Sequence, residues 1–189
     1  MRRTISEARL RRLDIQGFDS VERDRLAQAG PWLRMAFGLC ATLALLGTAT
    51  ASTVLLGVLA AIAFTAALSP VHPFDLLYNH GIRHLRGTPP LPGRGAPSRF
   101  ACGLGSVWLL LTIWAFESPA SGLGYALGFT LVASATLVTT TDVCIPSMIY
   151  RAIFGPPRTR SIDEPPSSQR TPSSSTGKMA SVAMAKPRR

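Results

Sequence analysis

Residues 35–74 read MAFGLCATLALLGTATASTVLLGVLAAIAFTAALSPVHPF, and this stretch decides the class of fold. Its 40 residues include no Asp, Glu, Lys or Arg. A second apolar stretch runs from Phe100 to Thr141 and is interrupted by one charge, Glu117. Because about 20 apolar helical residues cross the hydrocarbon core of a bilayer, each stretch is long enough for two spans. The sequence therefore predicts an integral membrane protein, and it excludes a soluble enzyme, a secreted disulfide scaffold and a disordered polycation.

We expect an all-α fold of four transmembrane helices, arranged as two hairpins that a cytoplasmic loop joins. The turn from Thr48 to Thr53 is rich in hydroxyl groups that can cap helix ends, and Ser118 is expected to cap the fourth helix. Small residues in the last two spans, including Gly124 and Gly128, predict close helix packing. The expected spans are residues 32–48, 52–69, 98–116 and 119–141.

The charge of the 189-residue chain is +10, and the 20 basic residues are distributed unevenly along it. Eight precede Met35, four lie in the loop between the hairpins and eight follow Thr141, whereas the two hairpin tips carry none. Basic residues are enriched in cytoplasmic loops, so the pattern predicts a bacterial inner-membrane protein with both termini in the cytoplasm. We expect these residues to contact anionic lipid headgroups and not nucleic acid, because they flank spans and do not gather on one soluble face.

The chain divides into three predicted parts: a basic arm (residues 1–30), a membrane domain (31–155) and a disordered Pro- and Ser-rich tail (156–189). In the arm, Thr4 to Glu7 has capping-box form and opens one short helix, and Asp19 to Glu22 opens a second that ends before Gly30 and Pro31. Two readings of the arm remain open, namely amphipathic helices on the cytoplasmic leaflet and a loosely ordered polar tail.

The central loop contains a predicted short helix in the membrane interface, over residues 74–85. Its expected apolar face consists of Phe74, Leu77, Tyr78, Ile82 and Leu85.

The central loop also holds the three histidines of the chain. His80 and His84 share the spacing of a metal-binding pair on one helix face, and His72 and Asp75 are near enough in sequence to complete a ligand set. The alternative is that these histidines contact lipid headgroups.

Three cysteines are predicted near one leaflet: Cys40, Cys102 and Cys144. Residues 144–147 read Cys-Ile-Pro-Ser, which is a Cys-x-x-Cys redox pattern with its second thiol replaced by Ser147. A thiolate at Cys144 could attack a disulfide, and Cys40 or Cys102 could then resolve the mixed disulfide. The alternative is that all three behave as small apolar residues. Asp142, beside Cys144, is expected to pair with Arg99 or Arg151.

These motifs together resemble an uncharacterised bacterial membrane family, the domain of unknown function 4395. The matching residues are Ser69-Pro70 with Leu77-Tyr78, then Pro97-Ser98-Arg99-Phe100-Ala101-Cys102-Gly103-Leu104-Gly105, then Cys144 with Tyr150. The resemblance covers residues 30 to 155 and implies two transmembrane hairpins. Members of the family look to have Cys-x-x-Cys where this chain has Cys144 and Ser147, so the resemblance does not carry over a dithiol.

Several functions remain open at this point. We recognise no catalytic residue set and expect no cofactor. The first hypothesis is a structural or accessory protein whose helices bind a membrane partner or a second copy. The second is thiol or sulfur chemistry at Cys144 on the cytoplasmic face. The third is metal binding by His72, His80 and His84.

Overall fold

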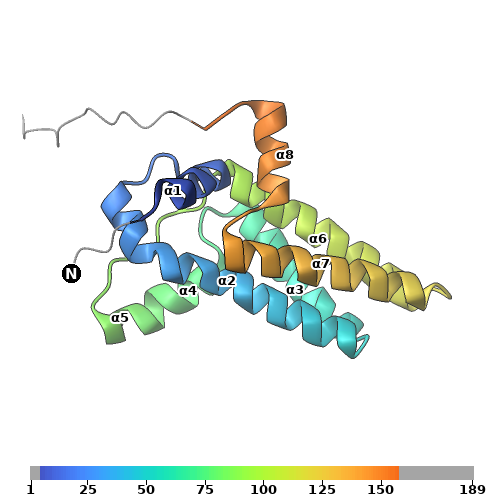
Figure 1. The fold of residues 1–189 in the computed structure, drawn as a ribbon. Helices are drawn as coiled ribbons and strands as arrows, with labels where there is room; N and C mark the ends of the chain where they lie inside the picture. Colours follow the sequence, from blue (N-terminus) through green and yellow to red (C-terminus); the bar gives the residue numbers. More distant parts are fainter. Residues whose placement is uncertain (1–4, 158–189) are drawn as a thin grey trace, which may run out of the picture.

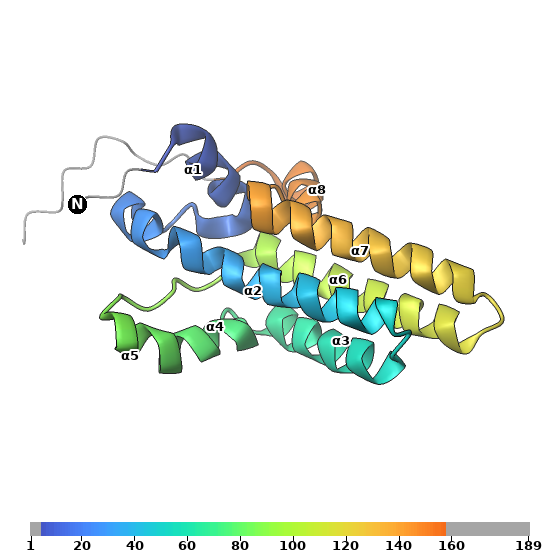
Figure 2. The same ribbon diagram turned by 60° about the horizontal axis from the view of Figure 1, so that its bottom comes forward.

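A computed structural model describes residues 5–157, and within that range every regular element is helical. Four long helices form a bundle: α2 (Arg23–Ala49), α3 (Thr53–Leu68), α6 (Ala96–Glu117) and α7 (Ser121–Thr141). Within the bundle, α3 packs mainly on α6, and α2 mainly on α7 (Figure 1). The α2–α3 and α6–α7 turns lie together at one end (Figure 2), as expected for two hairpins.

Three of these helices, α2, α6 and α7, are each long and apolar enough to cross a membrane. Helix α3 has only 16 residues and qualifies only together with the helical segment that follows it, after a bend of 86°. The bend arises because Pro70 forces Ser69 into an extended conformation, with φ −105° and ψ 144°. Residues 5–157 therefore contain three or four candidate spans, where the sequence predicted four.

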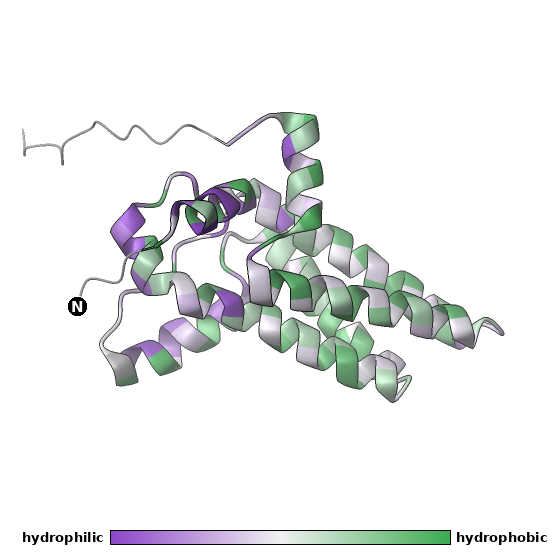
Figure 3. Ribbon diagram, in the orientation of Figure 1, coloured by the Kyte–Doolittle hydropathy of each residue, from purple (hydrophilic) through white to green (hydrophobic). Residues whose placement is uncertain are grey.

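The remaining helices lie at the end of the bundle opposite the hairpin tips. The arm forms α1 (Glu7–Leu13) and the π-helix η1 (Asp14–Phe18), the central loop forms α4 (Pro73–Leu77), η2 (Tyr78–Ile82) and α5 (Arg83–Arg86), and α8 (Ile145–Phe154) follows α7. Hydrophilic residues are concentrated in this end of the molecule, whereas the shafts of the long helices are hydrophobic (Figure 3). The predicted tail (156–189) lies outside the described residues from residue 158 onward, as does Thr4 of the predicted capping box.

The first span does not start where the sequence suggested. The predicted break at Gly30 and Pro31 is wrong, because α2 continues through both residues from Arg23. Proline lacks one N–H, so Pro31 leaves the Ala27 carbonyl, four residues before it, without its helical partner. Next to Pro31, the Arg9 guanidinium donates a hydrogen bond of 2.9 Å to a different carbonyl, that of Gly30. The arm therefore packs directly on the proline turn of α2.

The helix caps match the sequence in one hairpin and not in the other. Ser52 caps α3 as expected, because its hydroxyl accepts the N–H of Leu55 at 3.3 Å. Ser118 does not cap α7. It lies at the C-terminal end of α6, where its hydroxyl donates to the Ala115 carbonyl at 3.0 Å.

The central-loop helix is present, from Pro73 to Arg86, and it buries only part of the predicted face. Tyr78 is buried and Ile82 packs against the same core cluster, whereas Leu77 and Leu85 are 58% and 88% exposed. Asp75, outside the predicted face, is buried as well. The face is set by two polar contacts, the ion pair of Asp75 and the 2.5 Å hydrogen bond between the hydroxyls of Tyr78 and Thr88. Periodicity of apolar residues alone does not reveal either contact.

Close packing at the predicted small residues is confirmed. A Cβ atom added at Gly128 would overlap Thr48 of α2, and one added at Gly124 would lie 2.7 Å from the Phe116 ring of α6. These glycines therefore pack against helices of the same chain.

The buried carboxylate of Asp142 joins the arm, α2 and the end of α7. Arg9 donates from Nε at 2.9 Å, and Arg34 donates from Nε at 2.8 Å and from Nη2 to the second carboxylate oxygen. Gln16 donates to the Asp142 carbonyl at 2.7 Å. The expected pairing with Arg99 or Arg151 is wrong: the Arg99 side chain binds carbonyls at the end of α3, and Arg151 binds carbonyls of η1 together with Asp19.

We expect Asp142→Asn to lower the stability of the folded protein by about 1–3 kcal/mol, because it leaves two partly buried guanidinium groups without a counter-charge. The measurement is thermal unfolding of the purified protein in detergent. Glu7→Gln is the matched control, since the Arg23–Glu7 pair is exposed and such pairs contribute about 0–1 kcal/mol. Equal melting temperatures for both variants would contradict a central role for Asp142.

Candidate functional site

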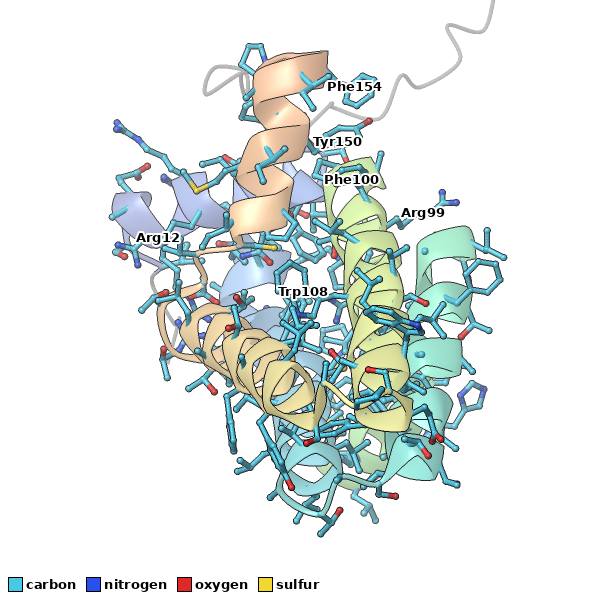
Figure 4. The ribbon with its side chains drawn as sticks, turned by 90° about the vertical axis from the view of Figure 1, so that its right-hand side faces the viewer. Arg12, Arg99, Phe100, Trp108, Tyr150 and Phe154 are labelled. Carbon is cyan, nitrogen blue, oxygen red and sulfur yellow. The ribbon has the colours of Figure 1, made fainter. Side chains whose placement is uncertain are left out.

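A cavity of about 300 Å³ lies between α6 and α7, beside the start of α8. Residues of α2 and α3 form its inner wall. Trp108 lies between α6 and α7 (Figure 4), and its indole N–H donates to the Leu127 carbonyl at 3.0 Å. The cavity lining is mostly apolar, and none of its residues is an Asp, Glu, Lys or Arg.

All three cysteines of the chain line this cavity. Cys40 comes from α2, Cys102 from the first turns of α6 and Cys144 from the connection between α7 and α8. All three are free thiols, and Cys102 and Cys144 are buried. The fold therefore brings residues that are far apart in the sequence into one group.

Cys144 lies at the N-terminus of α8, and Ser147 is in the first turn of that helix. The Ser147 hydroxyl lies 3.2 Å from the sulfur of Cys144 and 3.3 Å from the Pro97 carbonyl. Burial raises the pKa of the Cys144 thiol, while the hydroxyl and backbone N–H of Ser147 and the charge of Arg94 act in the opposite direction. Because burial is the largest effect, the thiol form is favoured at neutral pH.

A second buried ion pair lies behind the cavity wall. Arg94 donates to the Asp75 carboxylate through Nε at 2.7 Å and Nη2 at 3.0 Å, and both side chains are at most 3% exposed. The guanidinium also lies 4.9 Å from the ring centre of Phe37, which lines the cavity. Its Nη1 is buried and has no hydrogen-bond partner among the described residues. The charge of Arg94 acts on all three thiols.

The three histidines do not converge. His72 is buried at the start of α4 and lines the cavity, whereas His80 and His84 are exposed on the helical segment that follows. Nδ1 of His72 accepts the N–H of Phe74 at 3.2 Å, which leaves the ring proton on Nε2. Within residues 5–157, no group of three or more His, Cys, Asp or Glu side chains is arranged to hold a metal ion.

Sequence reasoning missed Arg94 and Trp108 as parts of this site. Arg94 was counted only among the basic residues that set orientation, and Trp108 only as an apolar residue of a span. The Pro- and Gly-rich segment before α6 carries Arg94 to Asp75, and the N–H of Arg94 donates to the Pro70 carbonyl at 2.7 Å. No local pattern in the sequence predicts that contact.

Comparison with known proteins gives a family and no function. No curated protein and no solved structure matches the chain. The model of the family described as "Domain of unknown function (DUF4395)" matches residues 30–154, which include all four long helices except the start of α2. That match covers more than half of the chain, so the protein belongs to the DUF4395 family, whose function is unknown.

Proposed function

We propose that this protein is a multi-pass membrane protein that carries out thiol–disulfide chemistry at the cavity between α6 and α7. One observation carries the proposal: the only three cysteines of the chain, from three separate segments, line the same cavity. A purely structural use of cysteine requires only that each thiol fill apolar space, and it gives no reason for the three to share one space.

The proposed reaction joins Cys144 and Cys102. The Cys144 thiolate attacks one sulfur of a substrate disulfide, and the other sulfur leaves as a thiol. The Cys102 thiolate then attacks Cys144, so that a Cys102–Cys144 disulfide forms and the second substrate thiol is released. Two protein thiols are oxidised while one substrate disulfide is reduced to two thiols. A dithiol reductant returns the protein to its starting state.

We assign the attacking role to Cys144 because it lies in the connection between two helices and receives hydrogen bonds from Ser147. A thiolate at a helix N-terminus is stabilised by the helix dipole and by free N–H groups. Members of the family look to have a Cys-x-x-Cys pattern at this place, and its second cysteine would stand at the position of Ser147. In this chain Cys102 takes that role instead.

We further propose that the end of the molecule holding the cavity faces the cytoplasm of a bacterial cell, with both termini on that side. The basic residues of the arm, the central loop and the segment after α7 support this orientation, because the hairpin tips carry none of them. In this orientation the exposed arginines of α1 meet anionic headgroups.

Association with a membrane partner or a second copy is a further possibility for the lipid-facing helices. Among the small residues that suggested it, Gly124 and Gly128 contact Phe116 and Thr48 of the same chain, so these two do not form an outward-facing surface. Thiol chemistry is therefore the function that the described residues support better.

Mild oxidation of the full-length protein with diamide is expected to remove two free thiols and to produce a peptide in which Cys102 and Cys144 are linked. The measurement is thiol titration followed by mass spectrometry of a non-reduced digest. Cys40→Ser is the matched control and should leave the link intact, whereas Cys102→Ser or Cys144→Ser should abolish it. Three thiols that resist diamide in the folded protein, but react once it is denatured, would overturn the proposal.

The alkylation rate of Cys144 should keep rising with pH beyond about 8.5, the ordinary pKa of a cysteine. Because burial raises the pKa of Cys144, the unreactive thiol persists to a higher pH than usual. The reactive thiolate forms only as the pH approaches that raised pKa, so the rate keeps rising. Ser147→Ala removes a hydrogen bond to the thiolate and should slow alkylation at pH 8 by about tenfold. The assay is timed maleimide labelling, with Cys40→Ser/Cys102→Ser as background. A rate that levels off below pH 8 would be the opposite result.

Alkaline phosphatase fused after Ala120, at the α6–α7 tip, should be active, and the same enzyme fused after Gly87, in the central loop, should be inactive. The enzyme folds only outside the cytoplasm, so this pair of fusions reports whether α3 crosses the membrane. An active Gly87 fusion would mean that α2 alone crosses in the first hairpin, which contradicts four spans.

A further inference from the structure

We infer that the cavity is a binding site for a quinone, which enters sideways from the lipid through the opening between α6 and α7. The inference rests on the proposed thiol function: the quinone takes the place of the substrate disulfide as the acceptor of the two electrons of Cys102 and Cys144, and the dithiol reductant supplies them. It thus names the chemical class of the oxidising substrate and its route.

The open side of the cavity is formed by the outer faces of the hairpin. Its exposed lining residues come from α6, α7 and α8, among them Leu104 (39% exposed), Ile145 (49%) and Ile149 (45%). None of the residues that line the cavity is charged. In a bundle that crosses a bilayer, such outward apolar faces meet lipid, so the opening connects the cavity to hydrocarbon.

The cavity also lies at the depth of a single leaflet. On α6 it extends from Ala101 to Leu109, and on α7 from Thr130 to Val138. Eight residues of α-helix rise about 12 Å, which is less than half of the ~30 Å hydrocarbon core. A molecule dissolved in that leaflet can therefore enter without passing through the headgroup region.

The lining favours a ring with carbonyl groups over a plain acyl chain. Phe37 and Trp108 offer flat aromatic surface, and His72 offers an Nε2–H donor because its Nδ1 already accepts the N–H of Phe74. A quinone has a planar ring and two carbonyl acceptors, whereas a hydrocarbon chain has neither. A volume of about 300 Å³ is at the lower end of the range of small-molecule sites.

The electron balance of the proposed step is complete. The thiols of Cys102 and Cys144 lose two electrons and two protons as their S–S bond forms, and the quinone gains both electrons and both protons and leaves as the quinol. Bilayer quinones are two-electron, two-proton acceptors, so no further oxidant is required.

The binding test uses the full-length protein in lipid nanodiscs and a short-tailed benzoquinone. We expect saturable quenching of tryptophan fluorescence, and Trp108→Phe should remove the saturable part. Gly105→Leu is the decisive variant: Gly105 lines the cavity, and an added Cβ meets no atom within 4 Å, so leucine fills the cavity without displacing a helix. Because the leucine side chain occupies the space that the quinone needs, binding should weaken about tenfold or more.

Gly122→Leu is the matched control, because Gly122 also has open space around it but does not line the cavity. Ala135→Leu, on the opposite wall, provides a second blocked variant if Gly105→Leu does not fold. Quenching that never saturates, or that is the same in both blocked variants as in the control, would overturn the inference. So would saturable quenching by brominated lipid tails that the quinone cannot displace, since an acyl chain would then occupy the cavity.

A redox test separates this inference from the proposed function. Reduced protein mixed with the quinone without oxygen should form one quinol for each two thiols lost, and Cys144→Ser should bind the quinone but form no quinol. If diamide links Cys102 and Cys144 but quinone forms no quinol, the quinone is not the acceptor and the thiol function stands. If the quinone binds but diamide forms no link, the site stands and the thiol function fails.

Discussion

The arrangement of the cavity depends on the ion pairs that hold Asp142. This residue ends α7 in a left-handed conformation (φ 58°), which turns the chain toward α8, and such a conformation is uncommon for a residue other than glycine. Arg9 from the arm and Arg34 from α2 hold its carboxylate in place. Cys144 follows two residues later, so the position of its sulfur depends on a contact made by the arm.

The second buried pair, Arg94 with Asp75, has a comparable effect on the inner wall. Burying both charges is costly, and neutral apolar residues would often give equal or better stability. What the pair adds is placement: it fixes a positive charge behind Phe37 and aligns α4, so that His72 lines the cavity. Within residues 5–157, one nitrogen of the Arg94 guanidinium, Nη1, is buried without a hydrogen-bond partner.

The sequence predicted those features that depend on local pattern. The charge-free stretches located the helices, Ser52 caps α3, and Gly128 marks the close contact with α2. The sequence did not predict contacts between residues that are far apart in the chain. Asp142 pairs with Arg9 and Arg34, which lie 133 and 108 positions before it, and nothing in the local sequence indicates these partners. Pro31 is a related case: α2 continues through it, and the contact of Arg9 with the neighbouring Gly30 carbonyl has no signal in the local sequence. The shared cavity of the three cysteines required the fold itself.

Five arginines hold the polar end of the molecule together, whereas no such residues line the side of the cavity between α6 and α7. Arg9, Arg34, Arg94, Arg99 and Arg151 each bind carboxylates or helix-end carbonyls within the chain. Their hydrogen bonds tie the arm, the central loop and α8 to the polar end of the bundle. Hydrocarbon offers no such partners, and the lining of the cavity between α6 and α7 contains no charged residue. In the proposed membrane orientation, a ligand that enters between α6 and α7 therefore comes from the lipid and breaks none of these ion pairs.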